Sequence, residues 1–279
     1  MPQFTPALDR VQQGAQQATR HAAPWIEKLA RLGYAAKGVV YIVLGLLALQ
    51  AAFGGGQATD SGGALRTIVL QPFGRVLLGV IALGLFGYVV WRLVSAFLNP
   101  EGEKAPKRVG YAISGVIHVG LAIEAVRLAM GRASGGGNGD QASHWTAEAM
   151  SQPLGRWAVA VAGIMIAGWG LQQLHHAYKV KLDKQLALGE LSGGMRAWVV
   201  RVGRAGLAAR GIVFGIIGIF VSLAALHTNP SEARGLGGAL QALEQQPFGP
   251  WLLGVVAVGL MAYGIYELVR ARYRRIQPA

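Results

Sequence analysis

Long stretches without charged residues constrain this chain more than any other feature of its sequence. About 20 helical residues are needed to cross the hydrocarbon core of a bilayer. Five runs contain no Asp, Glu, Lys or Arg, and they cover Gly38–Thr59, Val76–Trp91, Trp157–Leu174, Gly211–Ser231 and Gln245–Tyr266. The second run reaches about Leu98 if Arg92 snorkels. A sixth segment, Val109 to about Met130, is apolar except for a few residues such as His118 and Glu124. These segments predict an all-α integral membrane protein with six transmembrane helices.

Overall composition agrees with a membrane location. Of the 279 residues, 53% are hydrophobic and only 14% are charged, which is too few charges to cover the surface of a soluble protein. The net charge of +13 does not favour nucleic acid as a partner, because the basic residues cluster between the apolar runs. The chain has no cysteine, which excludes disulfides and thiolate chemistry. Its first thirty residues lack the apolar core of a cleavable signal peptide.

Two sequence landmarks recur three times each. The first reads RLGYAAKGVVY at Arg31–Tyr41, RVGYAISGVIH at Arg108–His118 and RAGLAARGIVF at Arg204–Phe214. The second reads QPFGR at Gln71–Arg75, QPLGR at Gln152–Arg156 and QPFGP at Gln246–Pro250. They define three two-helix repeats, at residues 31–100, 107–180 and 201–272, between an N-terminal segment (1–30) and a tail (273–279).

A short helix is expected inside each repeat, before the second landmark. These stretches begin at Gly63–Leu65, Ala147–Ala149 and Gly238–Leu240 and are about two helical turns long. We interpret them as helices lying at the membrane interface. The proline of the landmark then favours the start of the next long helix, because it fixes its own backbone angle.

The distribution of basic residues predicts the topology. The N-terminal segment, the connections between repeats and the C-terminal end carry 20 of the 26 Lys and Arg residues, which leaves 6 on the opposite side. Since basic loops stay in the cytoplasm, both termini are expected there, in the inner membrane of a bacterium. Residues Leu8–Leu32 are compatible with an amphipathic helix on that surface or with disorder. The basic residues of Arg270–Arg275 would attract anionic lipid headgroups.

The two landmarks resemble a bacterial membrane family known as domain of unknown function 1206. The resemblance covers the chain from about Arg31 to Arg270 and includes all three copies. It implies a six-helix bacterial membrane protein and carries over no catalytic residues. The middle copy departs most, since Ser114 and His118 replace the Lys37 and Tyr41 of the first copy.

Motifs for catalysis or cofactor binding are not found. The chain has no phosphate-binding loop, no His-Glu-x-x-His motif and no nucleophile elbow. His175 and His176 are adjacent on a helix and therefore point about 100 degrees apart, which disfavours a shared metal. We expect no cofactor and no metal.

Two groups of polar residues are candidate sites. Ser114 and His118 share a face of the third transmembrane segment, and Glu124 with Arg127 follows one to two turns later. Ionisable groups at membrane depth usually face protein or water. The second group is Lys37 with Arg210, which either snorkel to the cytoplasmic surface or form a ring of cations at a pore mouth. In the first group, either Glu124 pairs with Arg127 and His118 hydrogen-bonds a neighbouring helix, or the residues form part of a path for protons, ions or substrate.

The repeats also suggest an architecture. Each has an even number of crossings, so all three insert in parallel and predict pseudo-three-fold symmetry about the membrane normal. We expect the glycine-rich odd-numbered spans to lie nearest the axis, and Gly211, Gly215, Gly218 and Ser222 to form one close-packing seam.

Function remains a choice among three alternatives. A non-catalytic scaffold or regulatory partner is favoured, because only the middle repeat has several polar groups in mid-span. It would bind another membrane protein or a second copy. A channel or transporter along the axis is the alternative, and an enzyme of the lipid phase has the least support.

Overall fold

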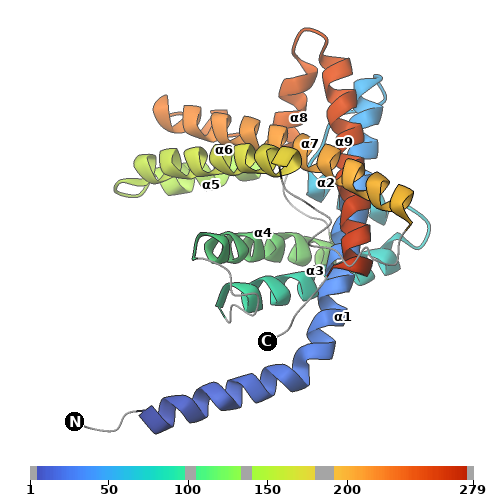
Figure 1. The fold of residues 1–279 in the computed structure, drawn as a ribbon. Helices are drawn as coiled ribbons and strands as arrows, with labels where there is room; N and C mark the ends of the chain where they lie inside the picture. Colours follow the sequence, from blue (N-terminus) through green and yellow to red (C-terminus); the bar gives the residue numbers. More distant parts are fainter. Residues whose placement is uncertain (1–4, 98–104, 133–139, 180–191, 275–279) are drawn as a thin grey trace.

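The computed structural model describes residues 5–97, 105–132, 140–179 and 192–274, without the side chains of residues 5–26, 106–107 and 140–141. The described chain is helical (Figure 1). Its elements are α1 (Thr5–Ala52), α2 (Ser61–Val69), α3 (Gly74–Phe97), α4 (Ala105–Ala129), α5 (Asp140–Met150), α6 (Gly155–Lys179), α7 (Gly193–Leu226), the 3-10 turn η3 (Pro230–Glu232), α8 (Leu236–Glu244) and α9 (Gly249–Tyr273).

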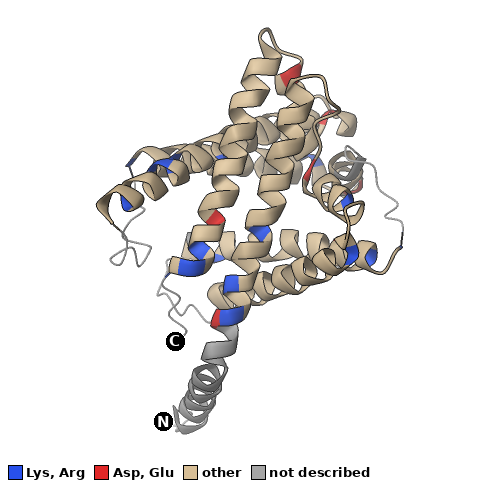
Figure 2. Cartoon of the chain, turned by 90° about the vertical axis from the view of Figure 1, so that its right-hand side faces the viewer, with Lys and Arg blue, Asp and Glu red and all other residues tan. Residues whose placement is uncertain are grey.

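Six helices are long and apolar enough to span a membrane, which confirms the predicted number. They are α1 from Glu27 onward, α3, α4 from Arg108 onward, α6, α7 and α9. Figure 2 shows basic residues gathered toward the end of the α1–α9 pair that lies nearest the chain termini. Most side chains of the predicted amphipathic segment, residues 1–30, lie outside the described residues. Residues 275–279 of the tail lie outside them as well.

A short helix precedes a tight turn in every repeat. The short helices are α2, α5 and α8, as predicted. In the turn, the third landmark residue has left-handed backbone in all three copies, with φ of 60° at Phe73 and 62° at Leu154 and Phe248. The next residue must be glycine, because a Cβ at Gly74, Gly155 or Gly249 would lie 2.1 Å or less from a carbonyl oxygen. The second long helix of each repeat begins at this glycine, two residues after the proline.

The long helices pack mainly as pairs drawn from different repeats. These pairs are α3 with α4, α6 with α7, and α1 with α9. Figure 1 shows the α1–α9 pair running across the direction of the other two. Because α9 of repeat 3 packs on α1 of repeat 1, the contacts between repeats are cyclic. Within repeats, α1 packs on α3 and α7 on α9, whereas α4 and α6 have no extensive contact in the described residues.

Glycines allow the closest helix approaches. A Cβ at Gly38 would lie 2.8 Å from Gly264 O across the α1–α9 pair. In the α6–α7 pair, Gly211 faces Gly170, Gly218 faces Ala167, and Gly163 faces Ser222. Gly211, Gly218 and Ser222 of the seam predicted in the fifth span therefore pack on α6, whereas a Cβ at Gly215 would meet no described atom within 4 Å.

Close packing of the odd-numbered spans on one another is not observed among the described residues. No two of α1, α4 and α7 pack extensively on each other in the described residues. The glycines of α1 explain the difference, because Gly33 faces Gly84 and Tyr88 of α3 while Gly38 faces Gly264 of α9. Helix α1 thus has small residues on two faces, and each face accepts an even-numbered helix.

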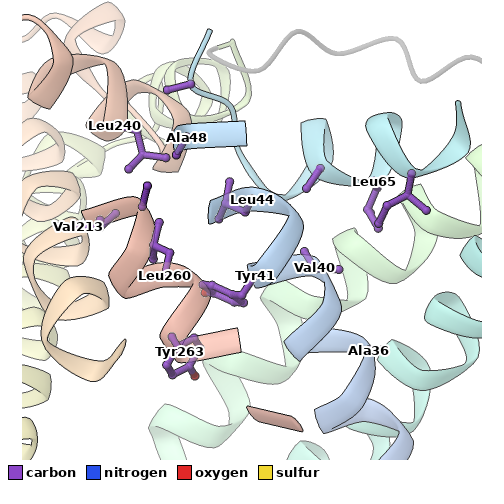
Figure 3. Close-up of a cluster of buried hydrophobic side chains, with 14 of the residues drawn as sticks. Ala36, Val40, Tyr41, Leu44, Ala48, Leu65, Val213, Leu240, Leu260 and Tyr263 are labelled. Carbon is purple, nitrogen blue, oxygen red and sulfur yellow. The ribbon is translucent and has the colours of Figure 1, made fainter. Parts of the chain in front are cut away.

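The largest buried cluster lies where α1 and α9 meet. Leu44, Leu260 and Val213 are completely buried there, and Figure 3 shows them facing one another from α1, α9 and α7. Tyr41 and Tyr263 lie at one end of this apolar cluster. The polar groups described next begin at these two tyrosines.

Candidate functional site

Four equivalent positions of the repeats supply most of a buried polar centre. Counting from the two landmarks places Lys37, Ser114 and Arg210 at one position, and Tyr41, His118 and Phe214 four residues later. On the second long helix of each repeat, Tyr88, Trp169 and Tyr263 are equivalent, and Arg92, Gln173 and Glu267 follow four residues later. We call these the cation, first-ring, second-ring and partner positions.

The ring positions pair in the same way at all three junctions between repeats. The centroid distances are 4.8 Å for Tyr41 with Tyr263, 4.7 Å for His118 with Tyr88, and 4.7 Å for Phe214 with Trp169. In each pair, the first-ring residue of one repeat packs on the second-ring residue of the preceding repeat, and repeat 1 follows repeat 3. The polar centre therefore has the same cyclic order as the helices.

Tyr263 joins the two candidate cations. Its hydroxyl accepts hydrogen bonds from Lys37 Nζ at 2.9 Å and from Arg210 Nη1 at 2.8 Å. Lys37 and Arg210 are only 3% and 8% exposed, so neither side chain snorkels to the surface. The guanidinium of Arg210 also stacks on aromatic rings, with Cζ 4.8 Å from the Tyr263 centroid and 5.0 Å from that of Trp169. The structure thus brings together two residues 173 positions apart in different repeats.

Glu267 is the one completely buried carboxylate among the described residues. Its Oε1 lies 3.4 Å from Lys37 Nζ and 2.9 Å from Arg270 Nη1. Arg270 stacks on the ring of Tyr34, whose hydroxyl accepts a hydrogen bond from Arg274. Arg270 of the basic C-terminal stretch therefore contacts this centre, and Arg274 contacts the neighbouring Tyr34, whereas their sequence suggested lipid headgroups.

The junction between repeats 1 and 2 has a cation but no carboxylate in the described contacts. Arg92 Nε donates to Tyr88 Oη at 2.8 Å, and the Tyr88 hydroxyl lies 3.5 Å from Ser114 Oγ. His118 Nδ1 lies 2.7 Å from the Ser114 carbonyl oxygen, so it is the donor of that bond. Ser114 and His118 therefore both contact Tyr88 of repeat 1.

Glu124 and Arg127 are not brought to this centre. Glu124 Oε1 lies 3.4 Å from Arg66 of α2, and its carboxylate packs beside Gly62. Arg127 is exposed on α4. Glu124 thus ties α4 to the short helix of repeat 1, which is a structural contact.

Sequence reasoning missed Tyr88, Tyr263 and Glu267. It placed Arg92 at the membrane surface, whereas that side chain is only 8% exposed and bonds Tyr88. Glu267 directly follows a charge-free run in the sequence, and its partner Lys37 lies 230 positions away. A signal did exist, since alignment of the second long helices places an aromatic residue at the same position in all three repeats.

The centre is a cluster of cationic and aromatic side chains, and these side chains themselves bury its charged groups. Lys37, Arg92 and Arg210 are buried and Arg270 is partly buried, against the single carboxylate of Glu267. Among the described residues, no group of three or more His, Asp and Glu side chains is placed to hold a metal ion. The absence of a cofactor stays a prediction.

Comparison with known proteins agrees with the repeat structure. The model of the family described as Domain of Unknown Function (DUF1206) matches the chain three times, at residues 32–99, 109–180 and 205–274. The chain is also 35% identical over 273 residues to the uncharacterized protein YxxB of Bacillus subtilis (strain 168), covering 96% of this chain and 97% of that protein. No solved structure matches.

Proposed function

The chain belongs to the DUF1206 family, and we propose that it is a non-catalytic membrane scaffold that binds another transmembrane helix at its middle repeat. One observation carries the proposal. Gly33 and Gly206 are equivalent, and a Cβ on either would lie 2.6 Å or less from atoms of Tyr88 or Tyr263 in the same repeat. A Cβ at the third equivalent, Gly110, would meet no described atom within 4 Å.

The middle repeat therefore leaves a helix-packing face that no described helix of this chain covers. Small residues in membranes mark places where another helix can approach closely. Only 22% of the spanning windows of α4 and α6 is buried, compared with 50–56% for α1, α3 and α9. Exposed residues of α4 such as Val109, Ile113 and Val116 would contact either lipid or a partner helix. The partner is a second copy of the chain or another membrane protein.

The proposal includes an axis and a topology. The three equivalent ring pairs support a pseudo-three-fold axis through the polar centre, and parallel insertion of the repeats supports its alignment with the membrane normal. The bias of Lys and Arg supports cytoplasmic termini in a bacterial inner membrane, with anionic headgroups near the exposed basic residues.

A channel or transporter is the second candidate. It is favoured by the excess of buried cations at repeat-equivalent positions, because charge inside a membrane protein often marks an ion path. Its weakness is that Lys37 and Glu267 have side chains only 4% and 0% exposed. The same closure disfavours an enzyme of the lipid phase, since substrate does not reach these groups while the helices stay packed.

Gly110→Leu tests the scaffold directly. We expect the unfolding temperature in detergent to stay close to that of the wild type, since substitutions that touch nothing usually change stability by less than about 0.5 kcal/mol. We also expect at least a tenfold loss (roughly 1.4 kcal/mol) of association, because the leucine fills the contact face. Self-association is measured by energy transfer between labelled copies in proteoliposomes, and other partners by quantitative co-purification.

A matched control replaces Gly120, on the same helix and also without a described atom within 4 Å of a Cβ. Association that survives Gly110→Leu would contradict the proposed binding face. Flux of protons or small ions through proteoliposomes, lost in His118→Ala or Arg210→Met, would instead establish the channel.

A further inference from the structure

One of the three junctions between repeats has a buried ion pair. At each of the other two, either the cation position or the partner position holds a neutral residue. Between repeats 3 and 1, the cation position holds Lys37 and the partner position holds Glu267, 3.4 Å apart. Between repeats 2 and 3, the corresponding residues are Arg210 and Gln173. The lysine therefore has a carboxylate, whereas the arginine has an amide at the equivalent place.

The packing of α6 on α7 supports this correspondence. The Arg210 guanidinium carbon lies 5.0 Å from the ring centroid of Trp169, and Gln173 is one helical turn after Trp169. A Cβ at Gly211, next to Arg210, would lie 3.1 Å from the backbone nitrogen of Leu174, next to Gln173. Gln173 and Arg210 thus lie on facing turns of the two helices.

Both side chains are buried and retain polar atoms without a partner. Gln173 is 6% exposed and Arg210 is 8% exposed. In the described part of the chain, Arg210 Nε and both the Nε2 and Oε1 atoms of Gln173 lack a hydrogen-bond partner. Arg210 Nη1 is bonded to the Tyr263 hydroxyl, so the unpaired atoms are Arg210 Nε and the two polar atoms of the Gln173 amide. Leaving such buried atoms without a partner costs free energy.

We infer that Gln173 and Arg210 form a binding site for a small monovalent anion, of the halide or carboxylate type. The anion accepts hydrogen bonds from the Arg210 guanidinium and the Gln173 amide and supplies the negative charge that Glu267 supplies at the equivalent junction. The rings of Trp169 and Phe214 form the apolar side of the site, because the Arg210 guanidinium carbon lies 5.0 Å and 4.9 Å from their centroids.

The test measures thermal unfolding of the purified full-length protein in detergent, in sodium bromide, acetate or gluconate at constant ionic strength. A ligand of the folded state raises the unfolding temperature as its concentration rises above its dissociation constant. We expect bromide, acetate or both to raise it relative to the bulkier gluconate. The comparison of bromide with acetate distinguishes a halide from a carboxylate ligand.

Gln173→Glu is the decisive variant, because it places a carboxylate where repeat 3 has one. We expect its unfolding temperature to be independent of the anion. Gln172→Glu, the exposed neighbour on the same helix, adds the same charge and should keep the wild-type response. Should Gln173→Glu fail to fold, Gln173→Met is expected to weaken the anion at least about tenfold.

Two outcomes would overturn the site. The first is a wild-type protein whose unfolding temperature is the same in all three salts. The second is an equal response to the anion in Gln173→Glu and Gln172→Glu, which would show a general salt effect. Neither result depends on whether a partner helix binds at Gly110.

Discussion

Replacing Glu267 with glutamine is expected to destabilise the protein by about 3–5 kcal/mol, because removal of one member of a buried ion pair leaves the opposite charge uncompensated. Lys37 and Arg270 both direct a nitrogen to Glu267 Oε1. The measurement is the unfolding free energy in detergent, or the unfolding temperature where unfolding is irreversible. The double variant Lys37→Met, Glu267→Gln should recover part of the loss, since it leaves one fewer unpaired cation.

The control for this prediction is Glu232→Gln. Glu232 pairs with His227 at 2.7 Å on the surface, where its side chain is 33% exposed and that of His227 is 57% exposed. Exposed ion pairs contribute about 0–1 kcal/mol. A loss in Glu267→Gln no larger than in this control would show that the buried carboxylate does not hold the centre together.

Gly206→Ala is expected to have the second large effect. Its Cβ would lie 2.4 Å from both the backbone nitrogen and the Cα of Tyr263, and backbone atoms cannot move aside as a flexible side chain can. Overpacking costs about 1–3 kcal/mol in ordinary cores and sometimes more. We expect a loss at the upper end of that range, or failure to accumulate folded protein, together with separation of α7 from α9.

Gly110→Ala is the matched control, at the equivalent position of repeat 2. A Cβ there meets no described atom within 4 Å, so a change within about 0.5 kcal/mol is expected. Equal losses in the two variants would mean that α4 and α6 pack on each other as α7 and α9 do. The asymmetry on which the scaffold proposal depends would then not exist.

Local signals explain why so much of the fold was predictable. Each charge-free run is enough to predict one transmembrane helix, and the landmark that occurs three times shows where each repeat begins. The turn after Gln71, Gln152 and Gln246 is equally local, since its glycine is required by a carbonyl oxygen a few residues earlier. These features depend on neighbours in sequence, so the residues alone are enough to find them.

The polar centre was harder to predict because its contacts join distant residues. Lys37 and Glu267 are close only because α1 packs on α9. The sequence around a charged residue at a helix end does not show whether its side chain faces water or a lysine. The partner of Glu124 was not predicted for the same reason, because Arg66 lies on a short helix of another repeat. The paired helices also follow from glycines on two faces of α1, which a search for a single seam does not reveal.

Closure of repeat 3 on repeat 1 is the central claim, and disulfide cross-linking tests it most directly. The chain has no native cysteine, so introduced pairs can be read without background. A Cβ at Gly254 of α9 lies 4.0 Å from Ala52 Cβ of α1, within the range that a disulfide requires. We expect Ala52→Cys with Gly254→Cys to form a bond within one chain on mild oxidation in membranes, identified by mass spectrometry of the linked peptides. Ala52→Cys with Ala160→Cys, the equivalent position of repeat 2, should form none. A bond in the second pair but not the first, or bonds only between chains, would contradict the cyclic arrangement.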